Sequence, residues 1–429
     1  MTPDSPIPSP ARSSVLSNPS FRRLWAIGLS ASTMRWMETV ALGAFVYDLT
    51  GNAFDVGLIF FFRQIPMLLL GAFIGVIADR ANRKLLMAAV LGVVSVTYAA
   101  MAVLVIRGEV ELWHIALAAL ISGLLWATDF PVRRAMIGDV VGQAKVGTAM
   151  GLDMASSNFT RIPGPLLAGA ILATVGIEAV YIMGSALFGV AALIALSLNY
   201  TSPPAPDRPA RPLANLKEGF SYIRGDMLIM ATLAVTVIMN MFAFPYQSQT
   251  AVIVKGTLGQ SDFMLGVLVA CEGLGATIGS LVVATRARPV AYTRIYIWGS
   301  VILLVAVLAF TQVPWYWAAL PLLFVGGLGM SGFGTMQSII IMSATPPHMR
   351  GRVLGVLAVS IGTGPMAALF LGIGAQLLGA PTAVAGSVII GLAGVAATLL
   401  IAPQFLKTRA VQPHERRSGQ LEARPADSR

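Results

Sequence analysis

Charged residues are scarce in this chain of 429 residues: Asp, Glu, Lys and Arg together make up 11% of it, against about 25% in a typical soluble domain. Cysteine occurs once, at Cys271, so no intrachain disulfide can form. The three histidines show no metal-ligand spacing. The sequence also has no G-x-x-x-x-G-K-[ST] loop to hold a nucleotide phosphate. We therefore expect no metal site, no cofactor and no use of ATP as an energy source.

Long apolar stretches are abundant instead. Hydrophobic residues make up 56% of the chain, and twelve stretches are each long enough to cross the roughly 30 Å hydrocarbon core of a bilayer as a helix. They cover residues 22–48, 54–78, 85–106, 112–138, 148–174, 178–199, 227–253, 263–284, 293–311, 317–343, 353–378 and 381–404. The pattern predicts an all-α membrane protein with twelve transmembrane helices.

Internal repetition divides these helices into two groups. Gly164-Pro165 lies within the fifth stretch and Gly364-Pro365 within the eleventh, an offset of about 200 residues that duplication of a six-helix unit predicts. We expect two pseudo-symmetric six-helix halves, a proline-rich cytoplasmic linker and two disordered tails. The corresponding ranges are 21–199 and 227–404 for the halves, 200–226 for the linker, and 1–20 and 405–429 for the tails.

The placement of basic residues predicts the orientation of the chain. If both termini are cytoplasmic, Lys and Arg should gather at the termini and in every second loop. Of the 29 basic residues, 24 lie there, and only Arg107 and Lys255 fall in the predicted outer loops. We therefore expect a multi-pass protein of the inner membrane. The net charge of +10 suits anionic lipid headgroups. Because the charge is scattered over many segments, it does not indicate nucleic-acid binding.

A charged tight turn follows the second stretch. It reads Gly75-Val-Ile-Ala-Asp79-Arg80-Ala-Asn82-Arg83-Lys84. This segment resembles the signature loop of the major facilitator superfamily, G-x-x-x-D-R-x-G-R-K, with Asn82 in place of a glycine. Asparagine tolerates a left-handed backbone, so the turn can survive the replacement.

The resemblance implies a gate at the cytoplasmic side. In that arrangement Asp79 would face the chain near Gly351, and Arg83 would pair with Asp139 at the end of the fourth span. Gly75 and Arg80 complete the predicted gate as the remaining signature positions.

Within the superfamily, three further segments are similar to the group that contains the enterobactin exporter and its efflux relatives. They are Phe130-Pro131-Val-Arg133-Arg134, the run from Arg161 to Gly169, and the run from Pro347 to Val353. The second contains Gly164 and Pro165, similar to a motif associated with exporters, in which a kinked helix is thought to seal the cavity. Pro165 removes a backbone hydrogen bond, and Gly169 permits close helix approach.

Ionisable residues inside predicted spans are candidates for function, because an unpaired charge there costs a few kcal/mol or more. The candidates for a substrate or proton role are Arg35, Glu38, Asp129, Arg161 and Glu272, and Arg63 on the second span is a further charge inside the membrane. Arg35 and Glu38 are three residues apart and share a helix face, so they are either a neutralised structural pair or a substrate and proton site. Asp129 has Arg133 one turn away, which favours a structural role.

Arg161 and Glu272 have no oppositely charged neighbour in sequence. Arg161 matches a buried arginine in the resembling exporter group, and a lone arginine at mid-depth would attract an anionic substrate or a carboxylate. Burial favours the protonated form of Glu272, which makes it a candidate proton carrier, although a hydrogen bond to another helix explains it equally well. Asp153 is expected to be a surface or gating residue near the cytoplasmic end.

Two polar residues complete the candidate site. Asn240 on the seventh span and Gln337 on the tenth have side chains able to hydrogen-bond a ligand, but such residues more often join helices to one another.

The predicted function is proton-coupled export of small organic molecules, siderophore-like or drug-like, by alternating access of a monomer that is not an enzyme. Uptake by proton symport and movement of a lysolipid are alternatives within transport. A polytopic membrane receptor or enzyme is a remote alternative, because the predicted outer loops are too short for a ligand-binding domain.

Overall fold

The structure is a computed structural model that describes residues 14–142, 144–203, 212–403 and 405. Within these ranges the side chains of residues 70–80, 130, 212 and 213 are outside the description. The described residues form helices joined by short loops and contain no strand. The predicted tails lie outside the described residues except for 14–20 and Phe405.

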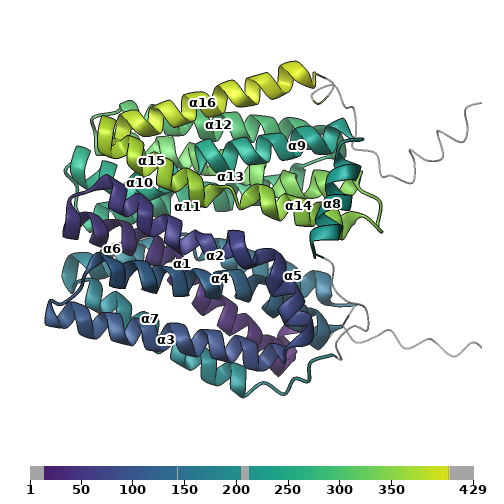
Figure 1. The fold of residues 1–429 in the computed structure, drawn as a ribbon, viewed down its shortest axis with the longest axis horizontal. Coiled ribbons are helices and arrows are strands. Elements are labelled where there is room, and N and C mark those ends of the chain that lie inside the picture. The colour runs from purple at the N-terminus through teal and green to yellow at the C-terminus, as the bar shows by residue number, and fades with distance from the viewer. Residues whose placement is uncertain (1–13, 143, 204–211, 404, 406–429) are drawn as a thin grey trace, which may run out of the picture.

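The first half contains seven α-helices, coloured purple to teal in Figure 1. They are α1 (Pro19–Thr50), α2 (Ala53–Arg80), α3 (Arg83–Arg107), α4 (Leu112–Val141), α5 (Val146–Phe159), α6 (Pro163–Thr174) and α7 (Ile177–Leu196). A short 3-10 helix, η1 (Val15–Ser17), precedes them.

The second half, green to yellow in Figure 1, packs along the first. Its helices are α9 (Met227–Ile238), α10 (Tyr246–Val252), α11 (Asp262–Arg286), α12 (Tyr292–Gln312), α13 (Tyr316–Ala344), α14 (Arg350–Ile361), α15 (Gly364–Leu378) and α16 (Ala380–Ile401). Two π-helical turns, η2 (Met239–Ala243) and η3 (Ile253–Thr257), flank α10, and the 3-10 turn η4 (Pro289–Ala291) precedes α12.

Helix ends differ from the predicted boundaries where capping decides them. The Asn18 side chain accepts hydrogen bonds from the backbone N–H groups of Ser20 and Phe21, so α1 begins at Pro19 inside the segment predicted to be a tail. Phe405, also assigned to a tail, is buried against the Tyr296 ring.

The predicted linker contains a helix of its own, α8 (Pro212–Ile223), which lies across the end of the bundle that carries the chain termini. It packs against α14, where the Glu218 carboxylate lies 3.0 Å from the Arg352 guanidinium. We call this end of the bundle the tail end and the opposite end, which contains Gly51 and Gly379, the far end.

Nine helical segments of the described residues are long and apolar enough to cross a membrane. The helix α1, the helix α2 and the α5–α6 pair are not among them. In the last case the helix is interrupted at Thr160–Ile162, which leaves pieces of 14 and 12 residues. The count of twelve spans and the orientation of the termini therefore stay predictions.

The two halves touch through pairs of glycines near the far end. A Cβ on Gly57 of α2 would lie 2.9 Å from the Cα of Gly372 on α15, and a Cβ on Gly169 of α6 would lie 3.0 Å from the Cα of Gly266 on α11. Such contacts bring helix backbones together because no side chain separates them. The close approach predicted for Gly169 is confirmed.

Candidate functional site

A cavity of about 480 Å³ lies between the halves. Its walls come from α1, α2, α4, α5 and α7 of the first half and from η2, α10, α14 and α15 of the second. The α2 residues that line it, from Phe60 to Met67, follow Gly57 along the helix toward the tail end. The cavity therefore lies on the tail-end side of the glycine contacts.

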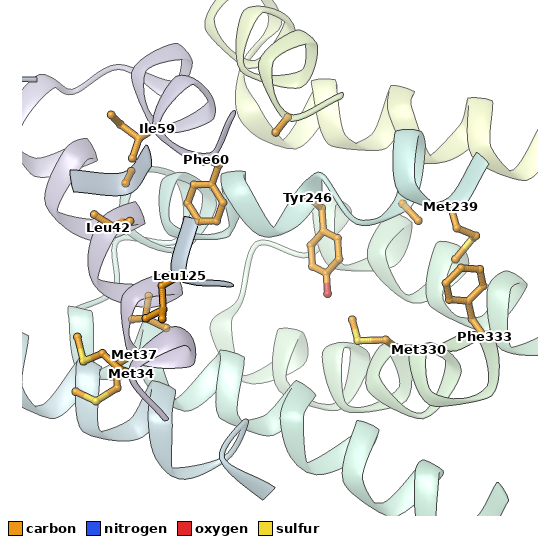
Figure 2. Close-up of a cluster of buried hydrophobic side chains, with 14 of the residues drawn as sticks. Met34, Met37, Leu42, Ile59, Phe60, Leu125, Met239, Tyr246, Met330 and Phe333 are labelled. Atoms are coloured by element: carbon orange, nitrogen blue, oxygen red, sulfur yellow. The ribbon is translucent and has the colours of Figure 1, made fainter. Parts of the chain in front are cut away.

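The cavity wall is partly aromatic and partly charged. Phe60 and Leu125, both visible in Figure 2, belong to its apolar portion. Tyr246 and Phe333, which Figure 2 shows in the second half, are buried in that half's core. A wall of this kind suits a small organic ligand with both apolar and polar groups.

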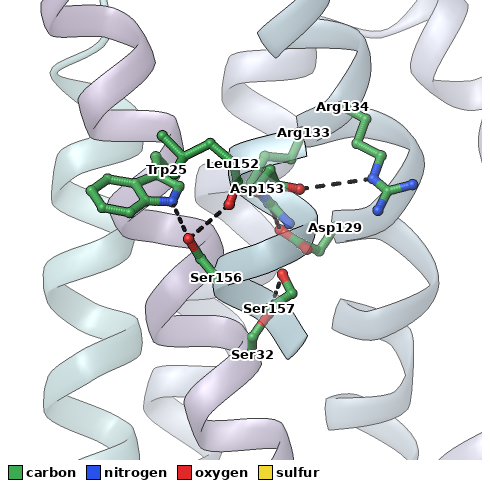
Figure 3. Close-up of polar contacts among 9 residues, drawn as sticks. All are labelled: Trp25, Ser32, Asp129, Arg133, Arg134, Leu152, Asp153, Ser156 and Ser157. Atoms are coloured by element: carbon green, nitrogen blue, oxygen red, sulfur yellow. Dashed lines mark hydrogen bonds and ion pairs between the residues drawn. The ribbon is translucent and has the colours of Figure 1, made fainter. Parts of the chain in front are cut away.

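A buried ion-pair cluster lies at the tail-end side of the cavity. Arg133 on α4 is 3% exposed and donates to Asp129, one turn away, at 2.9 Å and to Asp153 on α5 (Figure 3). The predicted pairing of Asp129 with Arg133 is confirmed. The expectation that Asp153 lies at the surface is wrong: it is 1% exposed, because α5 packs this face against α4.

Hydrogen bonds attach α5 to α1 next to this cluster. The Trp25 indole donates to the Ser156 hydroxyl at 2.9 Å, and the Ser32 and Ser157 hydroxyls lie 3.2 Å apart (Figure 3). These two contacts hold α5, which carries Asp153, against α1.

Glu38 pairs with Arg63 of α2, with 3.2 Å between the carboxylate and the guanidinium. Arg63 also donates to the Thr39 hydroxyl at 2.9 Å and to the Arg35 carbonyl at 2.8 Å. The pairing of Arg35 with Glu38 is therefore not the one the structure forms: a shared helix face brings the two side chains near each other, but Arg63 reaches across from the neighbouring helix.

Arg35 instead stacks on aromatic rings. Its guanidinium carbon lies 3.2 Å from the centroid of the Trp126 ring and 5.2 Å from that of Trp36. Cation–π contact of this kind stabilises a cation without neutralising its charge.

Arg161 and Glu272, both without a charged neighbour in sequence, lie together across the interface between the halves. The guanidinium is 3.7 Å from the Glu272 carboxylate, and its carbon lies 4.4 Å from the centroid of the Trp36 ring. Arg161 is thus not the lone arginine that the sequence indicated, nor does it neutralise Glu38 or Asp129. It lies in the break between α5 and α6, where the chain crosses over α11.

The Arg161–Glu272 pair borders a separate small cavity of about 20 Å³. Trp36, Thr39 and Gln247 line both this cavity and the central one. These three side chains form a partition, a wall between the ion pair and the central cavity. Gln247 also donates to Glu272 at 3.5 Å.

The two polar candidates differ in position. Asn240 lines the central cavity and donates to the Thr236 carbonyl at 2.9 Å. Gln337 is buried on α13 and donates to the Thr236 hydroxyl at 2.8 Å, which joins α13 to α9. It is not among the residues that line the cavity.

Comparison with known proteins gives the family. A family model described as transmembrane secretion effector, within the major facilitator superfamily, matches residues 11–428. The chain belongs to this family. The transporter is 22% identical to the staphyloferrin A transporter of Staphylococcus aureus, over 80% of this chain and 86% of that one. It is 26% identical to the enterobactin exporter EntS of Shigella flexneri, over 86% and 82%.

Solved structures with the same fold have low sequence identity. A bacterial homologue of the human lysosomal transporter Spinster, in an inward-facing and unoccupied conformation, superposes with a TM-score of 0.72 at 15% identity and covers 91% of this chain and 98% of its own. The nucleoside transporter NupG superposes with a TM-score of 0.71 at 13% identity, over 89% and 98%. At these identities the likeness shows the fold alone.

Part of the transporter's predicted gate is present as a contact. Arg83 lies 2.9 Å from Asp139, and the Tyr200 hydroxyl donates to the same carboxylate at 2.6 Å. Burial and this hydrogen bond raise the pKa of Tyr200, which keeps its hydroxyl a donor. Both Arg83 and Asp139 belong to the first half, so the pair joins α3 to α4. Its role in gating stays a prediction, and the side chains of Gly75, Asp79 and Arg80 lie outside the described residues.

The transporter's exporter-like segment packs tightly. A Cβ on Gly164 would lie 2.8 Å from the Trp36 Cβ on α1. Pro163 occupies the first position of α6, and Pro165 follows inside its first turn, so the prolines mark a new helix start. Sequence reasoning missed the lining by Trp36 and Trp126. The available signal was the position of both tryptophans well inside predicted spans, away from the membrane interface.

Proposed function

We propose that the transporter exports small organic molecules from the bacterial cytoplasm in exchange for protons. The observation that supports this most directly is the central cavity of about 480 Å³ between the two halves, with an apolar wall and ion pairs. The relatives named for staphyloferrin A and enterobactin favour a siderophore-like or drug-like cargo, and the family description favours outward transport.

The proposed orientation puts the tail end in the cytoplasm, as the distribution of basic residues indicates. The glycine contacts then close the outer side, and the central cavity lies on the side from which an exporter takes its cargo. A further ion pair supports closure of the far end: Lys255 of the second half lies 2.5 Å from Asp48 of the first. Opening to the outside would require these contacts to separate, as rocking of the halves implies.

Glu272 is the proposed proton carrier, with Glu38 as the second candidate. Glu272 is 4% exposed and faces Arg161 across the interface between the halves. Protonation would remove the counter-ion of Arg161 and so change the relative free energies of the two cavity shapes. The partition of Trp36, Thr39 and Gln247 lets proton and cargo occupy neighbouring cavities at different times.

The test uses purified protein in proteoliposomes, sorted by which side of the protein faces outward. Three fluorescent probes cover different charges: fluorescein, N-phenyl-1-naphthylamine and rhodamine 6G. When the cytoplasmic face is outside and the lumen is acidic, at least one probe should accumulate beyond protein-free liposomes, and nigericin should stop it. Glu272→Gln should bind the probe yet fail to accumulate it.

Other results of the proteoliposome experiment would contradict a specific part of the proposal. Accumulation only with the pH gradient reversed would indicate symport and exclude export. Gradient-independent movement of every probe would exclude proton coupling. If both Glu272→Gln and Glu38→Gln accumulate the probe like the wild type, neither carboxylate carries the proton.

A further inference from the structure

Charges on the wall of the central cavity do not balance. Four arginines line it, and three carboxylates lie within ion-pair distance of three of them. The pairs are Arg63 with Glu38 at 3.2 Å, Arg133 with Asp129 at 2.9 Å and with Asp153, and Arg134 with Asp153 at 3.8 Å. The fourth arginine is Arg35, and among the described residues its guanidinium forms no ion pair.

The charged groups around Arg35 do not supply a hidden counter-ion. Three of the charged groups around it, Arg63, Arg161 and Arg133, are cations. The two nearby carboxylates have other partners: the Asp129 oxygen accepts a hydrogen bond from Arg133 at 2.9 Å, and Glu38 lies 3.2 Å from Arg63. The space beside Arg35 is therefore electropositive and lies within the membrane-embedded part of the bundle, where an unbalanced charge is costly.

The guanidinium is held in a geometry that suits an acidic group. Its face stacks on Trp126 at 3.2 Å from the ring centroid, which fixes its plane. Stacking leaves the N–H groups along the edge of the plane available, and among the described residues no hydrogen bond uses them. An arginine edge of this kind matches the two oxygens of a carboxylate.

The rest of the wall suits an organic body. Phe60, Phe244 and Met67 offer apolar and polarisable surface, and the amides of Gln64 and Asn158 offer hydrogen bonds without charge. A volume of about 480 Å³ is within the range of cavities that bind drug-sized molecules.

We infer that the central cavity selects organic anions and that Arg35, stacked on Trp126, binds their acidic group. This inference rests on the proposed transport function and names its substrate class. It transfers to Arg35 the role that the sequence gave to Arg161, whose charge is instead matched by Glu272. A bound anion balances the remaining positive charge of the wall, so the loaded cavity has the lower electrostatic cost within the membrane.

The test measures binding of two aromatic probes of the same size, 2-naphthoate and its neutral amide 2-naphthamide, by calorimetry on the full chain in nanodiscs. The wild type should bind the anion about tenfold or more tightly than the amide, because a charge-assisted pair adds to the shared ring contacts. Arg35→Gln should remove that preference and leave the affinity for the amide within about threefold.

Controls separate the role of Arg35 from net charge and from folding. Arg107→Gln removes a positive charge at the far end of α3 and should keep the preference for the anion. Arg35→Lys keeps the charge without the planar edge and should show an intermediate preference. If Arg35→Gln does not fold, the preference of Arg35→Lys for the anion tests the inference in its place. An unchanged preference in either Arg35 variant, or a wild type that fails to bind 2-naphthoate at millimolar concentration, overturns the inference.

The outcomes are distinguishable from failure of the proposed function. Proton-driven accumulation of rhodamine 6G or the neutral probe, combined with no preference for 2-naphthoate, would leave export standing and remove the anion selectivity. Arg35-dependent binding of 2-naphthoate without accumulation of any probe would leave the anion selectivity standing and exclude proton-driven export.

Discussion

Arg161 of the first half lies 3.7 Å from Glu272 of the second half, so an ion pair crosses the interface beside the central cavity. Arg161 lies in the break between α5 and α6, and Glu272 lies on α11. The helices α6 and α11 also meet at Gly169 and Gly266. A charge change at either residue therefore acts on the contact between the halves.

Removing one member of this pair should destabilise the protein more than removing both. Arg161→Gln leaves the Glu272 carboxylate buried without its cation, and we expect a loss of about 3 kcal/mol, whereas Arg161→Gln with Glu272→Gln should recover much of it. Thermal unfolding of the purified variants measures this. The matched double variant Arg161→Gln with Glu38→Gln should show no recovery; equal recovery in both would refute the assignment of the pair.

Asp153 should be essential to the first half although it was predicted to lie at the surface. Asp153→Asn leaves Arg133 with one carboxylate in place of two, in a site where Arg133 is 3% exposed. We expect a loss of stability of about 3 kcal/mol. Glu109→Gln, at an exposed position, should change stability by less than about 0.5 kcal/mol. Comparable unfolding temperatures for the two variants would contradict the buried position of Asp153.

A methyl group at Gly169 should weaken closure of the far end. In Gly169→Ala the new Cβ would lie 2.7 Å from the Asp262 carbonyl oxygen, so α6 and α11 must move apart. Gly92→Ala on α3 is the matched control, because nothing lies within 4 Å of its Cβ and alanine favours the helix by about 1 kcal/mol. Labelling of a cysteine introduced at Ala53, which is 7% exposed at the far end, should become faster in Gly169→Ala only. Identical rates would exclude a sealing role for this crossing.

Asp139→Asn should slow transport with a small effect on stability. The Asp139 side chain is 36% exposed, so loss of its contact with Arg83 should cost about 1 kcal/mol or less. If the contact positions the end of α4 during cavity closure, the maximal transport rate should fall while probe affinity stays unchanged. Tyr200→Phe removes the other hydrogen bond to the same carboxylate and should have the weaker effect. Wild-type rates in Asp139→Asn would leave the contact with a structural role only.

Much of the fold was predictable because apolar stretches and turns are local properties. Helix positions, the contact of Arg83 with Asp139 and the i,i+4 pairing of Asp129 with Arg133 all follow from spacing or from a family motif. Partners across helices were not predictable. Glu38 pairs with Arg63 and Arg161 with Glu272 because of how helices cross, and sequence distance contains no information about such crossings.

The same limit explains the errors at Asp153 and in the terminal segments. Asp153 lies near the start of the predicted span 148–174, which made exposure the simplest interpretation, but it is in the middle of α5, which turns it toward Arg133. The start of α1 at Pro19 depends on the Asn18 cap, and the helix α8 depends on its contact with α14. Neither is visible in hydropathy.

The glycines at the far-end contacts and the residues of the cavity wall differ in how freely they can be replaced during evolution. At Gly57, Gly169, Gly266 and Gly372 any side chain would separate two backbones, so a change there alters the frame on which both halves rest. Most of the cavity wall consists of side chains that project into open space and is under no such restriction; Gly123, packed against the Arg63 backbone, is an exception. A lineage of these transporters can therefore acquire new cargoes by exchanging residues around Trp126 and Phe60 while the four glycines keep the scaffold constant.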